Sequence, residues 1–147
     1  MHLLVWSLDS QRYALPIDTV DRVIRAVAPT ALPGAPAIVS GVIDVAGRLT
    51  PLVDMRGRLG LPPRPVQAAD GMVLARTERR PVAFYVDVVE PVIEIEDSAV
   101  TAIDTIADGT RHLRGVGKTA DGMILIQDLA RFLSFEEETE LERTLLA

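Results

Sequence analysis

The chain has 147 residues and a net charge of −6, which argues against nucleic-acid binding because phosphate recognition needs a basic face. It contains no cysteine, which excludes a disulfide framework, a zinc thiolate site and thiol catalysis. No apolar run reaches the length of a membrane span and no signal peptide is recognisable, so we expect a cytoplasmic protein.

Short β-branched runs separated by polar or glycine-rich turns predict a mainly β chain. The first part of the chain is expected to form a hairpin of 2–8 and 12–17, a turn of helix near 18, a strand to 27 and a proline-rich loop at 29–36. A strand–turn–strand–helix stretch follows at 41–60, and then a hairpin of 71–76 and 81–87. After an irregular polar segment at 98–112, a second strand–turn–strand–helix stretch is expected at 115–133.

A final helix is predicted at about 135–146. Ser134 and Glu137 have the spacing of a capping box, and Leu141, Leu145 and Phe135 are expected to face inward. The acidic residues 136–138 suit the positive end of this helix, so we interpret them as a solvated helix start and not as a metal site.

The stretch 41–60 is the centre of the predicted organisation. Ala46 and Gly47 supply the turn, where glycine adopts positive φ at little cost. Pro51 lacks a backbone donor, which predicts that its strand lies at a sheet edge or carries a bulge there. Asp54 is placed to cap a short helix of residues 55–59, which Gly60 ends.

The chain contains an internal repeat. Residues 115–133 align with 41–59 at an offset of 74, and Ala14–Ile24 aligns with Ala83–Ile93 at an offset of 69. The alternative is that a valine-rich chain aligns with itself by composition. The repeat predicts two similar units, a first at about 12–61 and a second at about 72–133, with a boundary near 62–71. The N-terminal strand can pair with either unit.

No constellation of residues predicts catalysis, a metal site or a cofactor. His2 and His112 have no partner nearby in sequence, and Glu94 and Glu96 on one strand face are expected to be solvated. Gly117-Lys118-Thr119 resembles the end of a P-loop, but the first glycine of that motif falls on His112 and a turn follows instead of a helix.

An ordered set of segments carries a family resemblance. It consists of Tyr13–Ile17, Val20, Leu32-Pro33, Pro36, Gly41–Gly47, Pro51–Arg56, Leu59-Gly60, Val82–Val89, Gly122–Asp128 and Leu129–Leu133. The set resembles the CheW family of chemotaxis coupling proteins over nearly the whole chain. The resemblance implies two SH3-like five-stranded barrels packed together, with no catalysis and no cofactor. It also implies an adaptor that links chemoreceptor tips to the regulatory domain of a CheA-type histidine kinase.

The resemblance also suggests site residues. The receptor-facing set is Val20, Arg22, Val23, Gly41, Asp44, Ala46 and Gly47, beside a groove between the units that receives the receptor's helical hairpin, and the kinase-facing set is Pro51 and Leu52. The family's central-turn arginine is replaced by Ala46, and its usual acidic partner by Arg22, which predicts a divergent receptor contact. Two other functions remain open on the residues alone: a self-associating structural module, and a small-molecule sensor that uses the inter-barrel groove.

Overall fold

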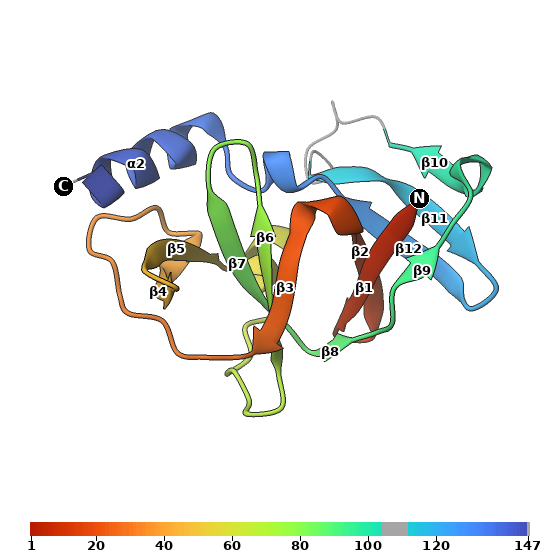
Figure 1. The fold of residues 1–147 in the computed structure, drawn as a ribbon, viewed down its shortest axis with the longest axis horizontal. Coiled ribbons are helices and arrows are strands. Elements are labelled where there is room, and N and C mark those ends of the chain that lie inside the picture. Colours follow the sequence, from red (N-terminus) through yellow and green to blue (C-terminus); the bar gives the residue numbers. More distant parts are fainter. Residues whose placement is uncertain (104–111, 147) are drawn as a thin grey trace.

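The computed structural model describes residues 1–103 and 112–146, and its fold is mainly β (Figure 1). Its strands are β1 His2–Leu8, β2 Gln11–Pro16, β3 Val20–Arg25, β4 Val39–Val45, β5 Arg48–Val53, β6 Gly71–Arg76, β7 Pro81–Val86, β8 Val88–Val89, β9 Ile93–Glu94, β10 Val100–Ala102, β11 Leu113–Thr119 and β12 Gly122–Gln127. Its helices are η1 Ile17–Thr19, α1 Met55–Leu59, η2 Asp97–Ala99, η3 Leu129–Arg131 and α2 Phe135–Leu146. The expected strands and helices are confirmed, while most of the predicted irregular segment at 98–112 lies outside the described residues.

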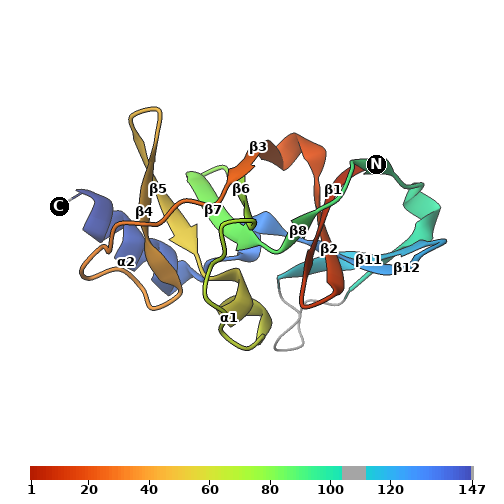
Figure 2. The same ribbon diagram turned by 90° about the horizontal axis from the view of Figure 1, so that it is seen from below.

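The strands form two sheets, which lie at the two ends of the long axis (Figure 2). Barrel 1 is the five-stranded sheet in the order β3-β6-β7-β5-β4. Barrel 2 is the seven-stranded sheet in the order β10-β11-β12-β2-β1-β8, with β9 also paired to β1. Barrel 2 has more than the expected five strands because the crossing segment 88–102 is broken into the short strands β8, β9 and β10.

The two barrels do not follow the predicted division into 12–61 and 72–133. Strand β2, from the predicted first unit, pairs with β12, while β6 and β7, from the predicted second unit, pair with β3 and β5. The N-terminal hairpin β1–β2 therefore belongs to barrel 2. The physical reason is that β2 and β7 each join their barrel through a parallel pairing, which requires a strand distant in sequence.

The internal repeat itself is confirmed residue by residue. The parallel pairs are Leu52 with Ala83 in barrel 1 and Ile126 with Ala14 in barrel 2, so both offsets found in the sequence recur in space. The hairpins β4–β5 and β11–β12 each carry a register shift at the same repeat position. Self-alignment by composition would not reproduce these pairings, so the two hairpins are structural copies.

A close backbone approach explains why both hairpins carry a glycine at this shift. A Cβ on Gly115 would lie 2.8 Å from the Thr101 carbonyl oxygen, and a Cβ on Gly41 would collide with the Thr30 carbonyl. Thr30 also exchanges two backbone hydrogen bonds of 2.8 Å with Val42. The segment around Thr30 in barrel 1 and the segment around Thr101 in barrel 2 thus pass so close to a hairpin that only glycine fits there.

The short helices after the two hairpins begin as predicted. The Asp54 side chain accepts a hydrogen bond from the Gly57 N–H at 3.0 Å, and Asp128 accepts one from the Ala130 N–H at 3.2 Å. Gly60 ends α1 with a φ of 74°. These caps fix the direction in which the chain leaves each barrel.

Pro51 is not at a sheet edge, because β5 lies between β4 and β7. The register shift of this hairpin lies between Val39 and Gly41 on β4, so the alternative prediction of a bulge at Pro51 is also wrong. Val42, the residue opposite Pro51, directs its N–H and C=O to Thr30. The pair of Val42 and Pro51 therefore has no hydrogen bond between β4 and β5, so the missing proline donor removes no bond from this hairpin.

Three apolar clusters hold the fold together. Barrel 1 encloses Ile43, Leu52, Met72, Leu74 and Ala83, and barrel 2 encloses Leu3, Val5, Ala14, Ile95, Ile124 and Ile126. A larger cluster between the barrels contains all of the closest aromatic contacts. Phe84 lies 5.1 Å from Trp6 and 5.9 Å from Phe132 between ring centroids. The largest core thus joins the two barrels instead of filling either one.

Helix α2 covers barrel 1 and begins with the predicted capping box. Ser134 Oγ accepts from the Glu137 N–H at 3.1 Å, and Glu137 Oε1 accepts from the Ser134 N–H at 2.7 Å. Leu141 is buried and Leu145 packs against the central core, as expected. The prediction for Phe135 is wrong: it is 73% exposed, because this first helical residue lies on the outer face.

The acidic start of α2 is only partly solvated. Glu136 is exposed, whereas Glu137 Oε1 lies 2.6 Å from Arg58 Nη2 and Glu138 Oε2 lies 3.0 Å from Arg80 Nε. These two ion pairs tie the helix to α1 and to the β6–β7 hairpin. The sequence suggested solvation because both arginines are far away along the chain.

Candidate functional site

Two of the predicted receptor-facing residues, Arg22 and Ala46, line one hollow of about 220 Å³ at an open end of barrel 1. We call this hollow the barrel mouth. It is formed by the start of β3, the β4–β5 turn and the adjoining ends of β6 and β7. Its lining residues are Asp21, Arg22, Val45, Ala46, Arg48, Thr50, Leu74, Ala75, Arg76, Pro81 and Val82.

The β4–β5 turn is a two-residue loop with both residues in the left-handed region. Ala46 has a φ of 50° and Gly47 a φ of 86°. Asp44 Oδ1 accepts a hydrogen bond of 2.8 Å from the Gly47 N–H, which fixes the turn. Asp44 and Gly47 therefore shape the mouth, and Ala46 occupies a position that asparagine or glycine would adopt at lower cost.

The other predicted receptor-facing residues lie elsewhere. Val20 is half-buried against the central core, and Gly41 is buried beneath Thr30. Val23 is 37% exposed, but it pairs with Val73, whereas Arg22 pairs with Leu74. Since neighbouring strand residues point to opposite faces, Val23 lies on the face of β3 away from the mouth.

The barrel mouth has an apolar floor and a basic rim. Leu74 and Val82 are 4% and 1% exposed at its base. Arg76 forms an exposed ion pair of 3.3 Å with Asp21. Arg22 and Arg48 are also exposed, and among the described residues neither forms a hydrogen bond or ion pair through its side chain. The mouth therefore presents two cations that no carboxylate of the described chain neutralises.

The predicted kinase-facing residues offer no surface. Leu52 is 1% exposed inside barrel 1, and Pro51 is also buried. The same strand carries an exposed apolar side chain, Leu49, which is 57% exposed. Its counterpart in the repeat is Met123, 61% exposed on β12. The sequence offered a signal for this pair, because each residue is the second after a hairpin turn and the two positions are aligned in the repeat.

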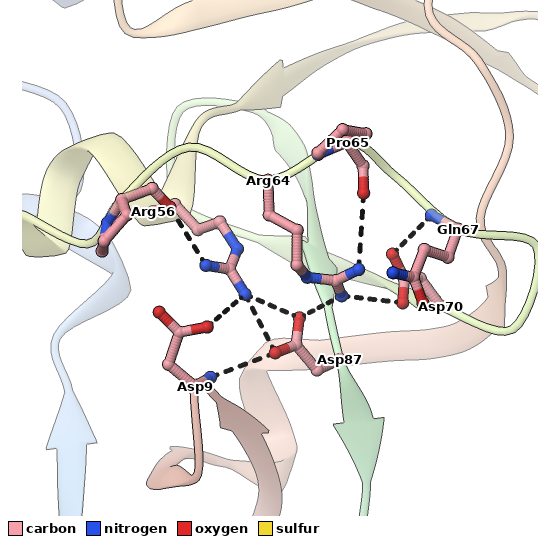
Figure 3. A network of polar contacts seen from close by, with 8 residues as sticks. Asp9, Arg56, Arg64, Pro65, Gln67, Asp70 and Asp87 are labelled. Carbon is pink, nitrogen blue, oxygen red and sulfur yellow. Dashed lines mark hydrogen bonds and ion pairs between the residues drawn. The ribbon is translucent and has the colours of Figure 1, made fainter.

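A second hollow, of about 310 Å³, lies beside α1 where the two barrels meet. A network of five charged residues that the sequence did not predict lies here (Figure 3), and four of its members, Arg56, Arg64, Asp70 and Asp87, line the hollow. Arg56 Nη2 donates to Asp9 at 2.8 Å and to Asp87 at 2.9 Å. Arg64 Nη2 donates to Asp87 at 2.6 Å and to Asp70 at 2.9 Å.

Asp87 is the centre of this network, because it also accepts a hydrogen bond of 3.0 Å from the Asp9 N–H. Burial raises the pKa of the Asp87 carboxyl, but the hydrogen bonds from the two arginines and from this backbone N–H outweigh it and hold the pKa below its ordinary value. Asp9 lies in the β1–β2 turn of barrel 2, while Arg56 lies on α1 beside barrel 1. The network thus connects the two barrels.

The residues considered for chemistry fall into structural positions. Gly117, Lys118 and Thr119 lie in β11, within its hairpin with β12. Within 1–103 and 112–146, no group of three or more potential ligands is arranged to hold a metal ion. The helices of the same residues include none that is both long and apolar enough to cross a bilayer.

Comparisons with known proteins agree on one family. The family model described as CheW-like domain matches residues 2–137. A chemotaxis protein CheW of Rhizobium meliloti is 30% identical over 92% of this chain and 88% of its own length. A probable chemotaxis protein CheW of Rhizobium etli is 29% identical over 95% and 90%. The crystal structure of the scaffolding protein TtCheW from Thermoanaerobacter tengcongensis superposes with a TM-score of 0.84, at 26% identity over 92% and 94%. This similarity supports the expected architecture of two SH3-like barrels.

Proposed function

The chain belongs to the CheW-like domain family, whose members are non-catalytic coupling proteins of chemotaxis, and from this premise we propose that it joins a CheA-type histidine kinase to a chemoreceptor. It acts in the cytoplasm, at receptor arrays, by binding the regulatory domain of the kinase and the cytoplasmic tip of the receptor. The comparisons do not favour the alternatives of a self-associating module or a small-molecule sensor.

The observation that carries the proposal is that barrel 1 has an open mouth lined by two of the residues expected to meet the receptor. Arg22 on β3 and Ala46 in the β4–β5 turn line the same hollow although they are far apart in sequence. An apolar floor within a polar rim suits an amphipathic helix of a receptor hairpin. We therefore assign the receptor contact to the barrel mouth.

We assign the kinase contact to one of the repeat-related side chains Leu49 and Met123. Both are large, apolar and more than half exposed, as expected for the centre of a docking surface. They lie on different barrels, so a kinase domain that engages barrel 2 through Met123 leaves the barrel mouth accessible. A contact of about 800 Å² per partner would be sufficient for a stable complex.

The test is a calorimetric titration with the regulatory domain of a CheA-type kinase from the same cell, followed by a receptor-tip fragment. We expect binding of both partners to the same molecule. Leu49→Glu and Met123→Glu are matched variants at aligned positions, and one of them should weaken kinase binding at least tenfold while the other leaves it unchanged. Failure of the unmodified protein to bind any such kinase domain would contradict the proposal.

A further inference from the structure

The barrel mouth is locally basic on an acidic chain. The whole protein has a net charge of −6, whereas the lining of the mouth contains three arginines and one aspartate. Asp21 is paired with Arg76, which leaves Arg22 and Arg48 available. Since a local reversal of charge attracts a partner of opposite sign, the mouth is complementary to an acidic surface.

The two arginines come from different strands that line the mouth. Arg22 lies beside Leu74 in the β3–β6 pairing, and Arg48 is the first residue of β5, directly after the turn. Ala46 contributes only a methyl group to the lining, so it leaves the hollow of about 220 Å³ open. An apolar side chain can therefore enter the mouth while flanking carboxylates reach the rim.

We infer that the barrel mouth recognises an acidic amphipathic helix of the receptor partner, in which an apolar anchor is flanked by carboxylates that pair with Arg22 and Arg48. This inference rests on the proposed function, and it specifies the chemistry of the receptor side. Residues three or four apart lie on one face of a helix, so an apolar residue with an acid at this spacing supplies both contacts. Guanidinium groups suit this role because they bind carboxylates in a two-pronged geometry.

The experiment compares charge reversals at the rim of the mouth with one on the opposite face of β3. The test variants are Arg22→Glu, Arg48→Glu and their combination. The control is Arg25→Glu, an exposed residue three positions along the same strand that pairs with Gly71 and lies on the face opposite Arg22. Each variant is titrated with the receptor-tip fragment at two salt concentrations, and with the kinase regulatory domain.

We expect the double variant to bind the receptor fragment at least 30-fold more weakly than the unmodified protein, and each single variant about 5- to 10-fold more weakly. The control should change the affinity less than twofold, and kinase binding should stay unchanged in every variant. The receptor affinity of the unmodified protein should fall with added salt more steeply than that of the double variant. Replacing the receptor acids with lysine, one at a time, should restore binding of Arg22→Glu at one position.

The two levels of the proposal fail differently. If the unmodified protein binds both partners but the double variant binds the receptor fragment equally well, the acidic-helix inference is overturned and the coupling function stands. An equal loss of kinase and receptor binding also overturns it, because the mouth would then not be specific to the receptor. If the unmodified protein binds neither partner, the proposed function itself fails. Arg22→Gln, which removes charge without reversing it, should lie between the unmodified protein and Arg22→Glu.

Discussion

Replacing Asp87 by asparagine tests whether the charged network at the barrel junction stabilises the fold. The carboxylate accepts hydrogen bonds from Arg56, Arg64 and the Asp9 N–H, all at 3.0 Å or less. Asparagine has the same size but keeps only one acceptor oxygen, and its amide directs N–H groups toward a guanidinium. The change therefore removes charge-assisted hydrogen bonds without creating a cavity.

The expected cost follows from burial and from the remaining partners. The side chains of Asp87, Arg56 and Arg64 are 22%, 13% and 24% exposed, so the network is more buried than a surface ion pair. Breaking a fully buried pair costs about 3–5 kcal/mol. Because Arg56 retains Asp9 and Arg64 retains Asp70, we expect Asp87→Asn to lower the free energy of unfolding by about 2–3 kcal/mol.

Urea unfolding followed by the fluorescence of Trp6 measures this loss. Trp6 is the chain's single tryptophan and is fully buried in the core between the barrels, so its emission reports the loss of that core. The control is Asp21→Asn, which breaks the exposed pair with Arg76 and should cost no more than about 0.5 kcal/mol. A loss for Asp87→Asn no larger than that of the control would refute the reasoning.

The same comparison depends on pH in a defined direction. The pKa of Asp87 is lowered in the folded state, so its carboxylate contributes stability above the unfolded-state pKa of about 3.9, and this contribution is lost as the pH falls through the folded-state pKa. The difference between the unmodified protein and Asp87→Asn should therefore be full at pH 7 and decrease below about pH 4. A difference that stays constant down to pH 2 would show that the charge of Asp87 is not responsible.

Three further substitutions test the turn, the crossing segment and the helix contact by the same unfolding assay. Gly41→Ala should lower the free energy of unfolding by at least about 2 kcal/mol, because the new Cβ collides with the Thr30 carbonyl. An unchanged unfolding midpoint would contradict the close approach of the Thr30 backbone to Gly41. Ala46→Asn should raise the free energy of unfolding by about 0.5–1 kcal/mol, because asparagine tolerates the φ of 50° better than alanine. A lower free energy of unfolding would mean that residue 46 does not have this positive φ. Glu138→Gln should lower the free energy of unfolding by about 1–3 kcal/mol, because Arg80 would lose its charged partner in a pair whose side chains are 14% and 11% exposed. An unchanged free energy of unfolding would count against this contact.

The local elements were predictable because their signals lie close together in the sequence. Gly47 followed by an extended run and then Asp54 describes a turn, a strand and a capped helix within a few residues. The second copy repeats this order at an offset of 74, which removed much of the ambiguity. The positive φ of Ala46 was not predicted, because it is required by the two-residue loop and alanine gives no sign of it.

The composition of the barrels was not predictable, because strand pairing is non-local. The parallel pairs of Leu52 with Ala83 and of Ile126 with Ala14 join segments that no local signal connects. The same limitation explains the error at Leu52, which was assigned to a surface although it points into barrel 1. A strand buried on both sides cannot be distinguished from an edge strand by its own residues.

The charged network was missed for a related reason, although Arg56 and Asp87 lie within the segments that carry the family resemblance. Asp9, Arg56 and Asp87 come from a turn, a helix and the end of a strand, and each reads as an ordinary polar residue in its local context. These three residues come together because the hairpin β1–β2 pairs with β12 of barrel 2, while the hairpin β6–β7 pairs with β3 and β5 of barrel 1. Long-range ion pairs of this kind depend on the topology, so they become visible only once the strand order is known.

The exchange of hairpins also bears on how a protein without catalysis couples two partners. A bridge between partners on two barrels is effective only if the barrels hold a fixed relative position, because free motion between them would cost binding entropy on both sides. Three features fix it here: the aromatic core around Trp6, the hairpins contributed by distant parts of the chain, and the network around Asp87. The mouth of barrel 1 and the exposed Met123 of barrel 2 are therefore held on one rigid body, which is the property that a coupling protein needs.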